Sequence, residues 1–233
     1  MTEILKLTPR LRAAAELVES GSFVADVGTD HAYLPIALCL EGRIRGGVAS
    51  DINQGPIDRA RDNIKKYGLE GSLDAVRTDG LDGIERYSPD CIMILGMGGE
   101  LIARILNDAP WTRKRGLRLC LQPMTHPEKL REFLLSEKYS IIDEKIVIEE
   151  NRIYQIILAE YNDMSQEYSE EQLLLGKINI ERRSAELLKL AEHYVSVIEK
   201  RADGKRSAGA DVAEDEMLIK KIKEAVYDGK TAL

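Results

Sequence analysis

The stretch "VADVGTDHAYLP", Val24 to Pro35, decides how the first part of the chain folds. An apolar run leads into Gly28, as a buried strand leads into a glycine turn, and a helical pattern follows the turn. A dinucleotide-binding turn carries two further glycines, whereas Thr29, Asp30 and His31 stand here. The order strand, turn, helix therefore predicts a nucleotide-type α/β unit whose ligand differs from a dinucleotide.

Six further apolar runs have the composition of strands, at residues 46–52, 73–79, 91–99, 117–123, 139–150 and 152–161. Helical patterns separate most of these runs, at residues 33–41, 56–67, 100–107 and 127–137. Such alternation predicts a mostly parallel sheet covered on both faces, and the last two runs predict a hairpin at one edge. The expected architecture is a Rossmann-like, doubly wound α/β domain with a seven-stranded sheet over residues 1–161.

The composition becomes helical after Tyr161. Residues 169–201 contain no proline and one glycine, and Ser169 with Gln172 has the spacing of a capping box. The apolar residues near one helical stripe are Leu174, Ile178, Leu188, Val195 and Ile198. A turn over Arg201–Asp211 would lead to a second helix capped by Asp211. We predict that residues 162–233 form a helical hairpin, packed as a short antiparallel coiled coil.

Composition and charge limit the class of protein. Of 233 residues, 44% are hydrophobic and 31% are charged, which is typical of soluble globular proteins. No apolar run approaches the roughly 20 residues that span a bilayer, and the N-terminus does not resemble a secretory signal. We therefore expect a cytoplasmic protein that does not enter a membrane. The three cysteines and three histidines are scattered, so neither a disulfide framework nor a metal site is expected.

The net charge of −7 comes from 33 basic and 40 acidic residues. Neither the first 160 residues nor the remainder is net basic, unlike many nucleic-acid binders. A nucleic-acid surface would therefore have to be local. The two candidate patches are Trp111–Arg118 and Glu199–Arg206, where the basic residues either contact phosphate or lie in solvated turns.

Acidic residues and glycines follow the first four predicted strands, and the carboxyl ends of strands are where open α/β sheets bind ligands. Asp51 lies about 20 residues beyond Gly28, where an acid can accept hydrogen bonds from both ribose hydroxyls of a nucleoside. Asp26 and Asp30 beside the turn disfavour a diphosphate and suit a cationic ligand. S-adenosylmethionine combines an adenosine with an ammonium and a sulfonium. Its predicted contacts are Asp26, Gly28, Asp30, His31, Asp51, Ile52, Asp79, Gly80, Gly96 and Met97.

The segments "ADVGTDHAYLP", "ASDIN", "RTDGL", "ILGMGG" and "LQPMTHPEKLREFL" together resemble the bacterial tRNA adenine N1-methyltransferases that modify adenine 22. The resemblance covers Leu7–Tyr161, and a C-terminal helical hairpin also belongs to the plan of that family. It implies a class I methyltransferase domain, S-adenosylmethionine as the methyl donor and tRNA as the acceptor. The implied reaction is methyl transfer to N1 of adenine 22.

Asp30 is the candidate catalytic residue. Methyltransferases of exocyclic amines commonly carry an Asn/Asp-Pro-Pro-aromatic loop after the fourth strand, whereas this chain has Gly-Met-Gly-Gly. Ring N1 has an in-plane lone pair, so positioning of the reactants would carry most of the catalysis. Asp30 could steady the adenine amino group and take a proton afterwards. Alternatively, Asp30 caps the helix that begins near Tyr33, and His31 either holds this loop or contacts the acceptor.

Several residues have both a functional and a structural interpretation. Gln122 either lines the pocket or ends a strand at a turn, and Tyr154 is either core or a platform for a base. Trp111 either stacks on RNA or anchors its loop. Arg10 and Arg12, on an expected N-terminal helix, either contact phosphates or only keep that helix solvated.

Three other functions remain possible on the sequence alone. A nicotinamide-dependent oxidoreductase shares the strand, turn and Asp51 pattern but lacks the second and third glycines. A non-catalytic RNA-binding protein would have less reason to keep the acidic set. The C-terminal hairpin would also suit a protein-interaction module, although a monomer is slightly favoured.

Overall fold

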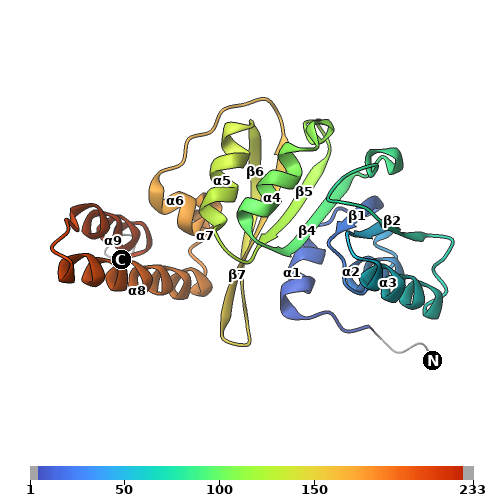
Figure 1. Cartoon of the computed structure of the whole chain (residues 1–233), viewed down its shortest axis with the longest axis horizontal. Helices are drawn as coiled ribbons and strands as arrows, with labels where there is room; N and C mark the ends of the chain where they lie inside the picture. The colour runs from blue at the N-terminus through green and yellow to red at the C-terminus, as the bar shows by residue number, and fades with distance from the viewer. Residues whose placement is uncertain (1–4, 228–233) are drawn as a thin grey trace. The chain divides into compact units, whose positions relative to one another are not determined.

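The computed structural model describes residues 5–227, and its seven-stranded sheet confirms the predicted α/β class (Figure 1). The sheet has the strand order β3-β2-β1-β4-β5-β7-β6. Strands β1 to β5 are parallel, and β7 runs antiparallel to both β5 and β6. The predicted edge hairpin is therefore β6–β7. The strands are β1 (Ser22–Val27), β2 (Ile44–Asp51), β3 (Leu73–Arg77), β4 (Cys91–Met97), β5 (Arg118–Pro123), β6 (Tyr139–Glu149) and β7 (Arg152–Tyr161).

Helices cover both faces of this sheet. The chain moves outward from β1 to β3 and then returns to β4 on the other side of β1, so the direction of winding reverses. Because parallel crossovers are right-handed, α2 and α3 lie on one face and α4 and α5 on the other. Helix α1 packs beside α2. The helices are α1 (Pro9–Glu16), α2 (Tyr33–Leu40), α3 (Gln54–Lys66), α4 (Gly99–Asn107) and α5 (Pro127–Ser136), with short 3-10 turns η1 (Glu85–Tyr87) and η2 (Pro110–Thr112).

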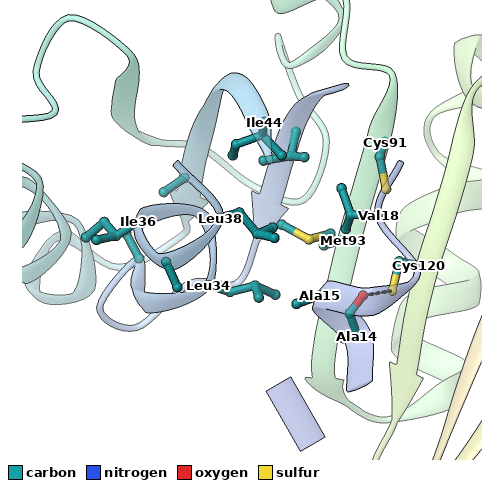
Figure 2. Close-up of a cluster of buried hydrophobic side chains, with 14 of the residues drawn as sticks. Ala14, Ala15, Val18, Leu34, Ile36, Leu38, Ile44, Cys91, Met93 and Cys120 are labelled. Atoms are coloured by element: carbon teal, nitrogen blue, oxygen red, sulfur yellow. Dashed lines mark hydrogen bonds between the residues drawn. The ribbon is translucent and has the colours of Figure 1, made fainter. Parts of the chain in front are cut away.

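The core on the α1–α2 face determines where α1 lies (Figure 2). Cys91 and Met93 of β4 belong to this cluster, and the strand alternation sends the residues between and after them to the opposite face. Small residues at positions 14 and 15 let α1 approach β5 closely, and the Cys120 Sγ lies 3.8 Å from the carbonyl oxygen of Ala14. One turn earlier, α1 consequently lies over the carboxyl end of β5.

A buried ion pair fastens α5 to the β6–β7 hairpin. Arg131 of α5 and Glu144 of β6 are fully buried, with 2.6 Å between the Arg131 Nη2 and the Glu144 Oε1. The same Nη2 donates to the Gln155 Oε1 of β7 at 2.8 Å. A buried charge without a partner is costly, so these contacts fix α5 relative to both strands. An arginine at this position would be predicted from sequence to lie on the solvent face of the helix.

The contacts divide the chain into two compact units, residues 1–166 and 167–233. The residues immediately after Tyr161 stay with the first unit, in part because the Lys138 Nζ forms an ion pair with the Asp163 Oδ1 at 2.7 Å.

The second unit begins with the predicted capping box. The Ser169 backbone N–H donates to the Gln172 Oε1 at 3.0 Å, and the reciprocal bond is also present. The continuous helix predicted after it is wrong, because Gly176 (φ 87°) and Arg183 (φ 53°) adopt left-handed backbone angles that interrupt it. The helices are α6 (Glu170–Leu175), α7 (Lys177–Arg182), α8 (Ala185–Ser207) and α9 (Ala213–Tyr227).

The buried stripe of α8 also differs from the prediction. Of the predicted stripe, only Ile198 is fully buried. The breaks place Leu174 and Ile178 on other helices, and Leu188 and Val195 of α8 are only half-buried. The stripe consists of Leu187, Leu190, Ala191, Ile198 and Ala202. The turn predicted over Arg201–Asp211 is wrong for residues 201–207, because these residues belong to α8. The Asp211 carboxylate accepts from the Ala213 N–H at 2.9 Å, in the predicted capping role.

Helices α8 and α9 pack against each other and are antiparallel. Lys205, late in α8, pairs with Asp215, early in α9, whereas Glu199, earlier in α8, pairs with Lys223, late in α9. The Lys205 ammonium, 2.8 Å from the Asp215 Oδ2, and the Arg201 guanidinium together hold the pKa of this buried carboxyl below its ordinary value. Arg206 pairs with Glu216 at 2.7 Å. A hairpin of two helices is thus present, and its coiled-coil packing stays a prediction.

Candidate active site

The structure brings the predicted site residues of the first four strands to one edge of the sheet. Val27 pairs with Ser50 of β2 and with Ile94 of β4, and Asp51 pairs with Arg77 of β3. The carboxyl ends of these strands are therefore adjacent. The segments that follow or end the strands carry Gly28, Asp51, Asp79 and Gly96, which lie along this edge.

The turn after β1 has no free amides at its glycine. Gly28 has φ 78°, and a Cβ added to it would overlap the Met97 Cε, so both backbone and space require glycine here. The N–H groups of Gly28 and Thr29 both donate to the carbonyl oxygen of Ser50, at 2.8 and 2.9 Å. A diphosphate is bound through amides that point at it. This turn therefore cannot offer these two amides to a diphosphate.

Asp26 is a buried carboxylate within this edge, with 8% of its surface exposed. Burial raises its pKa to about 6, and a hydrogen bond from Thr29 lowers it by a smaller amount. Among residues 5–227, no cation forms an ion pair with it. A cationic group of a ligand placed beside Asp26 would compensate for this burial.

Asp30 lies at the outer side of the same loop, and its side chain is 63% exposed. It forms an ion pair with Arg59 of α3 and a second contact with the His31 Nε2 at 3.1 Å. The hydrogen bond from Arg59 holds the pKa of Asp30 below its ordinary value. The His31 ring stacks on Tyr33, with 4.8 Å between the ring centroids. Asp30 and His31 thus tie the loop to α3 and to the start of α2.

The alternative that Asp30 caps α2 is wrong. Helix α2 begins at Tyr33, its N-cap residue is Ala32 in the left-handed region, and no side chain caps it. The Ala32 N–H donates instead to the Thr29 hydroxyl at 3.0 Å. This bond orders the loop just before the helix and does not cap it.

The ends of β2 and β3 provide an acid beside exposed apolar surface. The Asp51 carboxylate accepts from the Asn53 N–H at 2.7 Å, which fixes its orientation. Ile52 follows it with 52% of its surface exposed. After β3, Asp79 is exposed, and Gly80 (φ 52°) lies against Ile105 of α4. An acid next to an exposed isoleucine suits a nucleoside, whose ribose donates hydrogen bonds and whose base is flat and apolar.

The glycines after β4 have a packing role. The Gly99 N–H donates to the Thr125 carbonyl at 2.8 Å, and the Met124 N–H donates to the Met97 carbonyl at 2.7 Å. A Cβ on Gly99 would clash with the His126 carbonyl oxygen. The loops that follow β4 and β5 are therefore joined through their backbones. This contact explains Gly99 without a ligand.

Arg10 reaches the carboxyl edge from α1. Its Nη1 donates to the Gln122 Oε1 of β5 at 2.7 Å, and its guanidinium lies 5.5 Å from the ring centroid of Tyr154. The same Nη1 is 3.8 Å from the position that a Cβ on Gly96 would take. Arg12 instead pairs with Glu41 at 2.7 Å. The sequence does not distinguish these two arginines. In the structure Arg10 lies at the carboxyl edge of the sheet, whereas Arg12 is paired with a carboxylate.

The Trp111–Arg118 patch lies at the end of the sheet opposite the candidate site. It immediately precedes β5, so it is at the amino ends of the strands. Arg113 pairs with Glu137, and Arg118 pairs with Glu19 at 3.4 Å.

Among residues 5–227, no group of three or more potential ligands could hold a metal ion, and no helix is long and apolar enough to cross a membrane.

Comparison with known proteins identifies the family. A family profile described as a methyltransferase domain matches residues 7–157. The tRNA (adenine(22)-N(1))-methyltransferase of Bacillus subtilis (strain 168) is 34% identical over 226 residues, which cover 94% of this chain and 93% of that protein. A Streptococcus pneumoniae structure in complex with S-adenosyl-L-methionine has a TM-score of 0.83 and 28% identity, covering 95% of this chain and 100% of that one. An M. capricolum structure in complex with S-adenosyl-homocysteine has a TM-score of 0.75 and 25% identity, covering 94% and 97%. The chain belongs to the methyltransferase-domain family and, within it, to the family of the Bacillus subtilis tRNA (adenine(22)-N(1))-methyltransferase.

Proposed function

We propose that this protein transfers the methyl group of S-adenosylmethionine to N1 of adenine 22 in tRNA. The observation that carries the proposal is the turn after β1, where the Gly28 and Thr29 amides are bound to Ser50 and a buried Asp26 lies beside them. That arrangement favours a cationic ligand over a diphosphate. The similarity to the Bacillus subtilis enzyme over 94% of the chain supports tRNA as the acceptor.

The residues at the edge fit the methyl donor group by group. Asp51 would accept hydrogen bonds from the ribose hydroxyls, with Ile52 and Gly80 against the adenine and Asp79 at its polar edge. Asp26 would face the ammonium, and the missing Cβ of Gly28 leaves the turn open, with Met97 and Gly96 beside it. His31, which stacks on Tyr33, would hold the loop after β1 beside the ligand. When bound, S-adenosylmethionine supplies an electrophilic methyl group on a sulfonium.

Positioning accounts for the chemistry. N1 of adenine holds its lone pair in the plane of the ring, so no base has to deprotonate it before it attacks. The N1–carbon bond forms as the carbon–sulfur bond breaks, the electron pair of that bond stays on sulfur, and the positive charge moves to the adenine. The rigid β4–β5 loops and the turn at Gly28 would hold the two reactants in line.

Asp30 is the candidate carboxylate for the adenine amino group. Because Arg59 lowers the pKa of Asp30, the carboxylate is a weak base and a good hydrogen-bond acceptor at neutral pH. We therefore assign it to holding the amino group, with proton transfer following only after N1 carries the methyl. Arg59 contacts one oxygen of this carboxylate and the His31 Nε2 lies 3.1 Å from the other, so the amino group would have to compete with one of these two contacts.

The second unit is proposed to add affinity for tRNA. Three of the four basic residues expected to contact phosphate, Arg201, Lys205 and Arg206, are engaged with carboxylates. Of this patch, we therefore assign phosphate contact to Lys200. Because tRNA is the acceptor, we place the protein in the cytoplasm.

Incubation of unmodified tRNA with the protein and S-adenosylmethionine, followed by nucleoside mass spectrometry, tests the proposal. We expect one N1-methyladenosine per tRNA, and none in a tRNA that carries guanine at position 22. Methylation elsewhere would contradict the assigned position. No methylation, together with tight binding of a nicotinamide dinucleotide, would instead favour the oxidoreductase interpretation.

A further inference from the structure

Charge is distributed unequally along the carboxyl edge of the sheet. Asp51 and Asp79 lie on the β2–β3 side of Gly28, whereas Arg10 lies on the β4–β5 side. If the first side holds the nucleoside of the methyl donor, as proposed above, then the acceptor must approach from the second side. The structure places Arg10 on that second side.

The guanidinium of Arg10 is held in place by neutral groups. Gln122 is fully buried, and its Nε2 donates to the Pro123 carbonyl at 2.8 Å, so its Oε1 is turned toward Arg10. The aromatic ring of Tyr154 lies beside the guanidinium. These contacts use one of the five N–H donors through Gln122, and neither partner neutralises the charge. Arg10 therefore presents a positioned cation with donors to spare.

We propose that Arg10 binds a phosphate that flanks the adenosine to be methylated, with Gln122 and Tyr154 as positioning residues. This rests on the proposed function. The base itself is a poor partner, because adenine gains positive charge as N1 is methylated and a nearby cation would oppose that gain. A phosphate oxygen pair matches the fork of a guanidinium. Gly96 carries no side chain between the guanidinium and the edge, which leaves an approach to it.

Arg12 provides a matched control on the same helix. It has the same side chain, lies two residues away and is paired with Glu41. Loss of its charge changes the net charge of the protein equally, without affecting the edge. An effect shared by Arg10→Ala and Arg12→Ala would therefore reflect long-range electrostatics.

The first measurement compares tRNA methylation by Arg10→Ala, Arg10→Lys and Arg12→Ala in the full chain. We expect Arg10→Ala to raise KM for tRNA by about 10- to 100-fold, Arg10→Lys to raise it less, and Arg12→Ala to stay within about twofold. The dissociation constant for S-adenosylmethionine, from calorimetry, should not change in any of them. Arg10→Ala should also lower the salt slope of tRNA binding by about one. Weakened cofactor binding in Arg10→Ala would overturn the proposal.

The second measurement removes the partner charge. tRNAs with a methylphosphonate at the 5′ or the 3′ phosphate of nucleotide 22 lack one negative charge. For one of the two, we expect the wild-type protein to lose affinity and Arg10→Ala to lose nothing further. Additive losses at both positions would mean that Arg10 only fastens α1 to the sheet, and the proposal fails. If the Arg10 proposal fails in this way, methylation of unmodified tRNA by the wild-type protein would still support the proposed function. The two proposals can therefore fail separately.

Discussion

Replacement of Asp26 by asparagine should stabilise the protein while weakening its hold on the methyl donor. Asp26 is buried without a cationic partner among residues 5–227, and its pKa is raised from an ordinary 3.8 to about 6. At neutral pH the fold therefore keeps a carboxylate ionised where burial disfavours the charge. Asparagine keeps the size and removes the charge. The site would lose the negative group that we assign to the ammonium of the ligand.

The magnitude follows from the pKa shift. A shift from 3.8 to about 6 corresponds to about 3 kcal/mol between the two protonation states. Because the folded pKa is the higher one, the stability that Asp26 contributes is present at low pH and is lost as the pH rises through about 4 to 6. The asparagine side chain of the variant does not titrate and has no such loss. The gain in the free energy of unfolding of Asp26→Asn should therefore grow from about zero near pH 4 to as much as about 3 kcal/mol near pH 7.

Denaturant unfolding at several pH values measures this difference. Trp111 is the single tryptophan of the chain, and it lies in the first unit, so its fluorescence reports the unit that contains Asp26. Asp62→Asn, at an exposed position of α3, is the matched control. A gain for Asp26→Asn that is the same at pH 5 and pH 8, or no larger than that of the control, would refute the reasoning.

Calorimetry gives the functional half of this prediction. We expect Asp26→Asn to weaken S-adenosylmethionine binding by about 10- to 100-fold, since an ionised partner is lost. The wild-type affinity should fall as the pH drops below about 6, where Asp26 becomes protonated. Unchanged affinity in the variant at pH 7.5 would remove Asp26 from the ligand site.

Three further predictions concern other parts of the proposed site. Asp51→Ala should weaken S-adenosylmethionine binding by about 10- to 100-fold in calorimetry, because the ribose loses a charged acceptor; equal affinity would exclude Asp51. Asp30→Asn should lower the single-turnover rate of tRNA methylation by about tenfold or more at unchanged cofactor affinity, whereas Arg59→Gln should stay within about threefold. Equal losses in these two variants would show that Asp30 only holds the loop. Truncation after Gln166 should leave cofactor affinity near normal and reduce tRNA methylation, and a full methylation rate would give the second unit another role.

The sheet was predictable because its strands are continuous apolar runs with helices between them. The edge that holds the candidate site followed from the same pattern, since a residue after a parallel strand must lie at the carboxyl end of the sheet. Asp51 and Gly28 come together for this reason alone, and no knowledge of side-chain packing was needed. The resemblance to the family rested on the segments that surround these strand ends.

Features that depend on contacts across the fold were not predictable. Gly98 and Gly99 suggest a ligand loop in the sequence, whereas the Thr125 side chain lies against Gly98 and the backbone of residues 125 and 126 lies against Gly99. Gly176 alone does not announce a helix break, because a glycine within a helix costs only about 1 kcal/mol and is often tolerated. Arg10 and Arg12 carry identical chemistry, and only the docking of Ala14 against β5 sends one of them to the edge. In each case a tertiary contact decides between interpretations that are equal locally.

Whether the backbone N–H groups after β1 are already hydrogen-bonded distinguishes ligands better than the number of glycines does. A glycine-rich turn binds a diphosphate because its N–H groups are unpaired and face the ligand. Here the Ser50 carbonyl accepts from both Gly28 and Thr29, so even added glycines would not create that site. The same pairing holds the turn close to β2 and therefore beside Asp51, the last residue of that strand. The Ser50 carbonyl thus removes the anion-binding site and holds the turn beside an acid. In this way a fold shared with dinucleotide enzymes can select a cationic nucleoside.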